Sequence, residues 1–181
     1  MKQAALLVID VQNGAFDGVR CPPISEPERL LSNARRLIDA ARAAGAPVVF
    51  IQHCDTEDAF EEGTPHWQLH PMLSPQAGDP VVTKRQSSAF EGTDLAAVLA
   101  NVDASELVLC GLQSEFCVSN TARSALANRF AVLIADDAHG TWPSMERSAG
   151  EISRQANADL EAAGAVLRGT DEIVERFRQS T

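Results

Sequence analysis

The chain has 181 residues, of which 45% are hydrophobic and 22% are charged, and its formal net charge is −10. This length and composition are typical of a single globular domain over residues 1–181, and they exclude disordered, collagen-like and coiled-coil proteins. A strongly negative surface repels phosphate backbones and anionic lipids, so we expect neither nucleic-acid nor membrane partners. Four cysteines without a CxxC pair suit a reducing compartment, and we expect a cytoplasmic protein.

Short apolar runs alternate along the chain with amphipathic stretches. Ser25 and Glu28 have the spacing of a capping box at the start of a helix that Gly45 ends, and Thr93 has the position of a helix cap. In chain order, the pattern predicts a strand at 4–9, the helix between Ser25 and Gly45, a strand at 47–52, a long polar excursion over 54–79, a strand at 79–84, a short helix after Thr93, a strand at 106–111, a helix over 117–128, a strand at 130–136, a helix within 144–163, a strand at 165–168 and a helix over 171–178.

Alternating strands and helices predict an α/β fold. We expect a Rossmann-like three-layer α/β/α sandwich with a mostly parallel, six-stranded sheet. In such sheets ligands bind beyond the carboxyl ends of the strands, at the point where the strand order reverses. Reactive side chains that directly follow strands are therefore the first candidates for a functional site.

Three reactive side chains meet that condition. Asp10 ends the first strand, Lys84 ends the third, and Cys117 opens the helix after the fourth. A helix start and a nearby ammonium lower the pKa of a thiol, a carboxylate can take its proton, and backbone N–H groups at the helix start can receive an oxyanion. The set is typical of nucleophilic acyl transfer, although each residue alone also suits a structural role as a turn residue, a surface charge or a small hydrophobe.

Sequence motifs around these residues resemble those of a known family. The stretches that carry the resemblance to the isochorismatase-like cysteine hydrolases are LLVIDVQNGAF (6–16), VVTKRQSSAF (81–90), CGLQSEFCVSNTARSA (110–125), FAVLIADDAHGTW (130–142) and TPHWQLHPML (64–73). Nicotinamidases and N-carbamoylsarcosine amidohydrolases belong to the same family. The likeness covers nearly the whole chain. Its motifs are specific to the family, but they say little about which substrate is bound.

The resemblance implies an isochorismatase-like hydrolase fold in which Asp10, Lys84 and Cys117 form a catalytic triad. It also implies a non-proline cis peptide bond at Leu112–Gln113. That bond would turn the N–H of Gln113, together with that of Cys117, toward the oxyanion of the reaction.

Aromatic residues in the same motifs are candidates for the substrate pocket. Phe16, Trp67 and Phe90 fall in segments that line the pocket in relatives, although two of them also suit the hydrophobic core. His53 and Glu115 are weaker candidates.

Metal binding is the main difference from one branch of the family. Nicotinamidases bind a metal through a D-x-H pair and further histidines, whereas this chain has His53 and Asp55 in the reverse order. His66 and His70 lie four residues apart, as on one helical face, but the spacing typical of a metal site is missing. We expect no metal and, without a GxGxxG or GxxxxGK[ST] motif, no nucleotide cofactor.

These observations favour a cofactor-independent enzyme that acts on a small molecule. Isochorismatase itself lacks the cysteine nucleophile, so Cys117 favours hydrolysis of a C–N bond in an amide, carbamoyl or ureide compound through a thioester. The alternatives are a hydrolase of the same family that acts on a vinyl ether or a cyclic imide, and a non-catalytic binding module that kept the fold. The resemblance also implies a homo-oligomer, a dimer or a tetramer.

Overall fold

The computed structural model describes residues 3–179, and a single sheet of six strands forms its centre. The spatial order of the strands is β3-β2-β1-β4-β5-β6, and every neighbouring pair is parallel. The strands are β1 (Gln3–Ile9), β2 (Val48–His53), β3 (Val81–Lys84), β4 (Ala104–Leu112), β5 (Ala131–Gly140) and β6 (Val166–Arg168). The predicted α/β fold is thus confirmed, and the sheet is parallel throughout.

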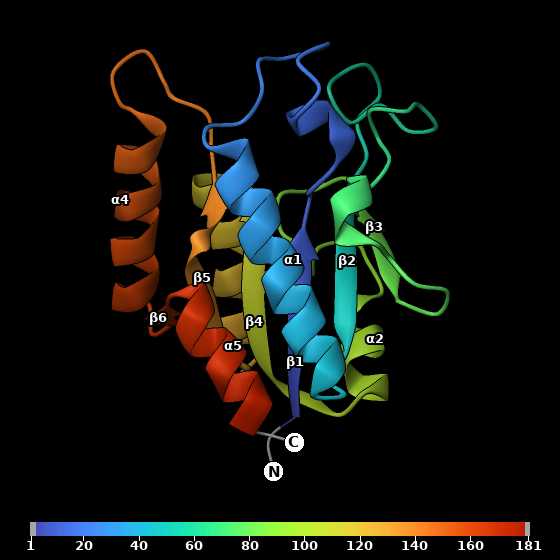
Figure 1. Ribbon diagram of the computed structural model, residues 1–181, viewed down its shortest axis with the longest axis vertical. Coiled ribbons are helices and arrows are strands. Elements are labelled where there is room, and N and C mark those ends of the chain that lie inside the picture. The colour runs from blue at the N-terminus through green and yellow to red at the C-terminus, as the bar shows by residue number, and fades with distance from the viewer. Residues whose placement is uncertain (1–2, 180–181) are drawn as a thin grey trace.

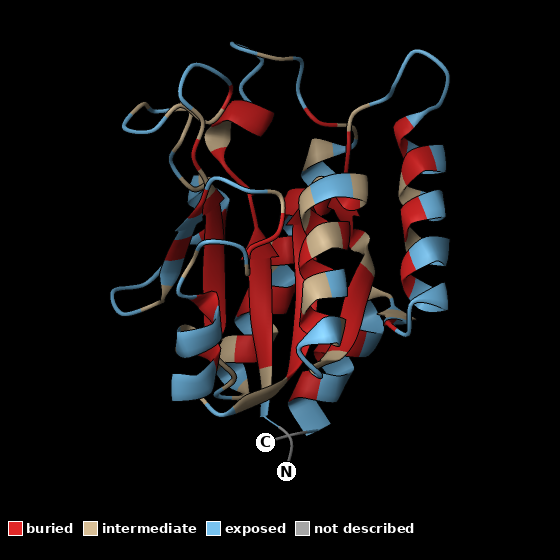
Figure 2. Cartoon of the chain, turned by 180° about the vertical axis from the view of Figure 1, so that it is seen from behind, coloured by how far each residue is buried: buried red, intermediate tan, exposed pale blue. Residues whose placement is uncertain are grey.

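Helices cover both faces of this sheet. Residues of α1 and α5 pack on one face, and residues of α2, α3 and α4 pack on the other (Figure 1). The central strands are buried between the two layers, and the outer faces of the helices are exposed (Figure 2). None of the helices within residues 3–179 has the length and apolar content of a membrane span. The helices are α1 (Pro27–Ala43), α2 (Leu95–Asn101), α3 (Ser119–Ala127), α4 (Ala149–Ala162) and α5 (Thr170–Gln179).

The apolar run of β1 explains why it lies in the middle of the sheet. Side chains alternate between the two faces of a strand, and here Leu6 and Val8 enter the core under α1 while Leu7 and Ile9 enter the opposite core. A strand that is apolar at every position suits only a sheet that is covered on both sides. The same run that predicted a strand therefore also predicts its central place.

The start of α1 differs from the prediction. Ser25 and Glu28 do not form a capping box, because the helix begins at Pro27 after a left-handed Glu26 that makes no side-chain cap. The fixed φ and missing N–H of proline suit the first turn of a helix, and these properties set the boundary here. A capping box does occur at the start of α4, between Ser148 and Glu151.

The strand order reverses between β1 and β4, and the two strands approach each other closely there. Gly111 of β4 has a φ of +121°, and a Cβ at this position would lie 2.0 Å from the backbone oxygen of Ile9. Only glycine fits both the backbone conformation and the space. The carboxyl ends of β1 and β4 are therefore held side by side where a ligand site is expected.

We predict that Gly111→Ala lowers the free energy of unfolding by about 3 kcal/mol or more, because the methyl group overlaps a buried backbone oxygen. Urea denaturation followed by circular dichroism measures the change. Gly150→Ala is the matched control, since a Cβ at that position would meet nothing closer than the Arg154 guanidinium at 3.4 Å. In a helix, alanine should raise stability by roughly 0.5 kcal/mol. Equal stability of the Gly111→Ala variant and the unchanged protein would contradict the close approach.

Candidate active site

Asp10, Lys84 and Cys117 come together at the carboxyl edge of the sheet, where the sequence placed them. Lys84 Nζ lies 2.8 Å from Asp10 Oδ2 and 3.1 Å from Cys117 Sγ. The side chains of Lys84 and Asp10 are 0% and 3% exposed. Two charges this deeply buried are stable only as a well-formed pair, because each has lost its hydration. The ion pair therefore fixes both side chains beside the thiol.

The Asp10 carboxylate and the Cys117 thiol are both held by irregular segments of the backbone. Asp10 directly follows β1 with a φ of 54°, and its N–H donates to the carbonyl oxygen of Ile51 at 3.0 Å. Cys117 lies in a π-helical turn, Ser114–Val118, that precedes α3. Single π-helical turns occur often at functional sites. The helix predicted over 117–128 thus has its regular part at Ser119–Ala127, and Cys117 lies in the distorted turn before it.

The peptide bond between Leu112 and Gln113 is cis, in agreement with the prediction from the resemblance. It lies between the end of β4 and the π-helical turn. Gln113 and Cys117 both line the cavity at this edge of the sheet.

Burial and the neighbouring Asp10 carboxylate raise the pKa of the Cys117 thiol to about 11, although Lys84 acts in the opposite direction. This corrects the expectation that a helix start and Lys84 would lower the pKa of Cys117. Burial likewise raises the pKa of Asp10 above its usual range, against the attraction of Lys84. A carboxylate with a raised pKa accepts a proton more readily. The free site accordingly holds a neutral thiol beside a carboxylate suited to deprotonate it.

His53 joins the same site more directly than the sequence indicated. Its Nδ1 lies 2.9 Å from Lys84 Nζ, and its Nε2 lies 3.0 Å from Asp55 Oδ1. An ammonium can only donate, so Nδ1 accepts, and Nε2 carries the proton that is donated to Asp55. The predicted strand stopped one residue short of His53, whereas β2 includes it and pairs it with Lys84 in register. A predicted strand that was one residue longer would have placed His53 beside Lys84.

The geometry does not favour a metal ion here. Among residues 3–179, Asp10, His53 and Cys117 are the group whose ligand atoms lie close enough to share an ion, within 4.8 Å of one another. Lys84 Nζ already contacts all three side chains and supplies the positive charge at that point. A divalent cation would have to displace this buried ammonium or suffer its repulsion.

The other predicted metal candidates lie apart from the triad. His66 Nδ1 pairs with Asp17 Oδ2 at 2.5 Å, and the ring of His70 packs on Phe16 at 4.9 Å between centroids. His66 and His70 line a separate, smaller hollow. The four candidates His53, Asp55, His66 and His70 are therefore not assembled into one site.

A cavity of about 680 Å³ opens above Cys117. Its walls come from the loop after β1, the excursion after β2 and the loop after β5. Its lining includes Cys21, Asp55, Asp58, Phe60 and Trp142, together with Asp10, His53, Leu112, Gln113 and Cys117.

The structure does not bring Phe16, Trp67 and Phe90 to this cavity. Phe16 packs on His70, Trp67 donates its Nε1–H to Cys54 Sγ at 3.1 Å, and Phe90 packs on Phe130. Phe60 and Trp142 supply the aromatic surface in their place. Their segments carry no periodic pattern, so the sequence offered no physical signal for them.

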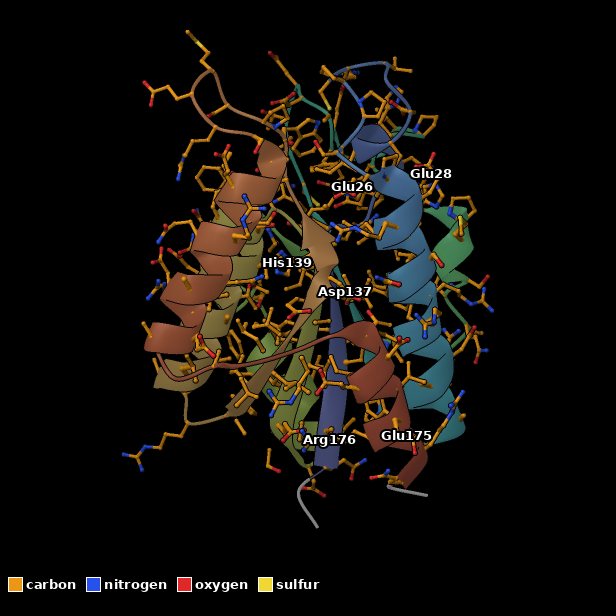
Figure 3. All side chains as sticks on the ribbon, turned by 60° about the vertical axis from the view of Figure 1, so that its left-hand side comes forward. Glu26, Glu28, Asp137, His139, Glu175 and Arg176 are labelled. Carbon is orange, nitrogen blue, oxygen red and sulfur yellow. The ribbon has the colours of Figure 1, made fainter. Side chains whose placement is uncertain are left out.

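A buried polar network supports the turn that carries Cys117. His139 Nδ1 lies 2.8 Å from Ser114 Oγ, and its Nε2 lies 2.8 Å from Asn157 Oδ1. Ser114 Oγ also lies 2.9 Å from Ser153 Oγ, so β5 and α4 both hold the turn. His139 is labelled beside the β5 ribbon in Figure 3. Burial lowers the pKa of His139, which keeps it neutral at pH 7.

The fold and the site together define an α/β protein with a thiol, a carboxylate and an ammonium at the carboxyl edge of a Rossmann-like sheet. The isochorismatase domain matches residues 4–172. The chain therefore belongs to the isochorismatase family of hydrolases.

Characterised relatives and solved structures support this assignment. The chain is similar to streptothricin hydrolase of Streptomyces noursei, with 36% identity over 170 residues that cover 93% of this chain and 60% of the relative. It thus spans less than two thirds of that protein. Ureidoacrylate amidohydrolase RutB of Serratia proteamaculans is 29% identical over 82% of this chain and 74% of its own length. The crystal structure of an isochorismatase-type protein from Burkholderia xenovorans LB400 has a TM-score of 0.89 and 36% identity, and covers 99% of this chain and 89% of that one.

We predict that Asp10→Asn speeds the alkylation of Cys117 at pH 8 even as it removes the proton acceptor. Asp10 raises the pKa of Cys117, so the amide should lower it and enlarge the thiolate fraction. In the unchanged protein the rate should climb with pH through 10 without a plateau, since the pKa is about 11. Iodoacetamide labelling measured by mass spectrometry gives both rates. Slower labelling of Asp10→Asn would contradict the assigned electrostatics.

Proposed function

We propose that this protein is a cysteine hydrolase that cleaves a C–N bond of a small amide, carbamoyl or ureide compound. The observation that carries the proposal is the contact of one buried ammonium with both a carboxylate and a thiol at the floor of a ligand-sized cavity. The name of the relative RutB, an amidohydrolase, supports the same bond type. The intact triad argues against a binding module that has lost catalysis.

The first half of the reaction forms a thioester. Asp10 takes the proton from Cys117 Sγ, and the thiolate attacks the carbonyl carbon of the substrate. The carbonyl electrons move to oxygen, where the backbone N–H groups of Gln113 and Cys117 receive the negative charge. The C–N bond then breaks, and Asp10 returns its proton to the leaving nitrogen.

The second half restores the enzyme. Asp10 takes a proton from water, which attacks the thioester carbonyl, and the C–S bond breaks to release the acid. The Cys117 thiolate then regains the proton from Asp10. Ammonia or an amine and a carboxylic or carbamic acid are the products.

Lys84 stabilises the thiolate during both halves. Four acceptors surround its three N–H donors, namely Asp10 Oδ2, His53 Nδ1, the backbone oxygen of Gln86 and Cys117 Sγ. A neutral thiol is a weak acceptor, so a donor can turn to Sγ as the charge forms there. His53 and Asp55 hold the ammonium in place.

We predict that Cys117→Ala lowers kcat by at least about a thousandfold, because no other group can form the thioester. A panel of small amides, carbamoyl compounds and ureides, assayed by ammonia release, identifies a substrate and measures the rates. Rapid acid quench with that substrate should leave its acyl mass on the Cys117 peptide. Cys54→Ser is the matched control, since this buried cysteine lies outside the cavity. Near-normal turnover by Cys117→Ala would refute the mechanism.

We also predict that activity survives exhaustive chelation. The Lys84 ammonium holds the position where Asp10, His53 and Cys117 could otherwise share a cation. Dialysis against a strong chelator, followed by metal analysis and the same ammonia assay, checks this. Loss of activity that is restored by one divalent metal would contradict the prediction.

A further inference from the structure

The cavity above Cys117 holds more negative charge than the proposed reaction uses. The charges of Asp10 and Lys84 cancel within their ion pair, and Cys117 is a neutral thiol at rest. Asp55 and Asp58 line the same cavity, and no lysine or arginine is among its lining residues. His53 donates to Asp55 from its neutral form, as the contact with Lys84 requires. Two carboxylates therefore face the cavity without a compensating charge.

Arg20 contacts the residue before Asp58 but forms no ion pair with Asp58 itself. Arg20 donates to the backbone oxygen of Glu57 and pairs with Glu61 at 2.5 Å, and it does not line the cavity. Asp58 Oδ1 accepts from the backbone N–H of Ala59 at 2.8 Å, and Asp58 forms no ion pair within the described part of the chain. Its negative charge stays available at the cavity wall.

The pKa of Cys21 is sensitive to the charge of Asp58, because both residues line the cavity. Cys21 lies in the loop after β1. Burial raises the pKa of the Cys21 thiol, and the carboxylates of Asp58 and Asp17 raise it further. A negative charge on Cys21 is thus disfavoured by Asp58. The same field attracts a positive charge at that place.

Aromatic rings in the cavity suit a positively charged ligand, and Asp10 at its floor is left for the proposed proton transfer. Phe60 and Trp142 line it, and proteins bind organic cations by combining aromatic rings with carboxylates. Asp10 is 2% exposed, and its Oδ1 has no hydrogen-bond partner within the described residues. Since Oδ2 pairs with Lys84, Oδ1 is the oxygen left to take the Cys117 proton and to return it to the leaving nitrogen of the substrate.

We propose that the substrate is an amide-type compound that carries a primary ammonium or a guanidinium group. The inference rests on the proposed function for the position of the scissile bond at Cys117. The cationic group lies against Asp58, Asp55 and Phe60, at the wall formed by the excursion after β2. Compounds with a carboxylate in that position are repelled.

Charged thiol reagents test the proposal without any knowledge of the substrate. The cationic (trimethylammonio)ethyl methanethiosulfonate and the anionic sulfonatoethyl methanethiosulfonate each form a mixed disulfide with Cys117. Both rates are normalised to those with free mercaptoethanol and are followed by tandem mass spectrometry, which separates Cys117 from Cys21. We expect the normalised ratio to favour the cation by about tenfold at low salt.

A pair of charge-neutralising variants locates the effect. Asp58→Asn should lower the cation preference by at least about threefold. Glu57→Gln changes the net charge equally at the adjacent exposed position, which lies outside the cavity, and should leave the ratio unchanged. A ratio at or below one in the unchanged protein, or the same ratio in Asp58→Asn, would overturn the proposal.

Three amides of equal length then test the preference in turnover. These are δ-aminovaleramide, hexanamide and adipic acid monoamide, which end in an ammonium, a methyl and a carboxylate group. We expect kcat/KM to decrease in that order, with a cation advantage that Asp58→Asn reduces. A faster reaction of the acid would overturn the charge inference while leaving the hydrolase function intact. If none of the three is hydrolysed, the thiol-reagent ratio still decides the charge inference separately.

Discussion

The buried ion pair between Lys84 and Asp10 is the interaction on which the site depends. Both side chains are almost fully inaccessible, so the loss of one would leave an unpaired charge with little solvation. The same ammonium contacts His53 at the end of β2 and Cys117 in the turn after β4. One nitrogen therefore ties together the ends of four segments that are distant in sequence. This explains how a site built from strand ends keeps its geometry.

The burial that strengthens the ion pair of Lys84 and Asp10 also keeps the Cys117 thiol protonated. Burial of Sγ and the negative charge of Asp10 outweigh the attraction of Lys84, so the pKa of Cys117 stays high. In the proposed reaction, the nucleophile forms only when Asp10 can take its proton, which would protect it from solvent reagents between turnovers. The hydrogen bonds of His139 with Ser114 and Asn157 hold the π-helical turn that carries Cys117.

The parts of the structure that follow a periodic pattern could be predicted from sequence, and these include the sheet and the triad. Apolar runs located all six strands, and strand ends located Asp10 and Lys84, because parallel strands present their carboxyl ends at one edge. The cavity walls could not be predicted, since Phe60 and Trp142 lie on irregular segments that long-range contacts position. The predicted direction of the shift in the pKa of Cys117 was wrong for a related reason. Sequence indicates which charges are near, but not how deeply the sulfur is buried.

The cavity wall and the catalytic groups are held by largely separate sets of bonds. Gln12 fastens the first half of the excursion, through its amide contacts with the backbones of His53 and Trp67. Between these anchors, residues 55–62 close on themselves through backbone bonds between Asp55 and Phe60 and between Glu62 and Asp55. Mutations at residues 56–62 can change the wall during evolution without touching the contact between Asp55 and His53 that supports Lys84. A protein with the same three side chains could therefore change its ligand through a handful of residues in this turn, and similarity of the whole chain would be a poor guide to what it binds.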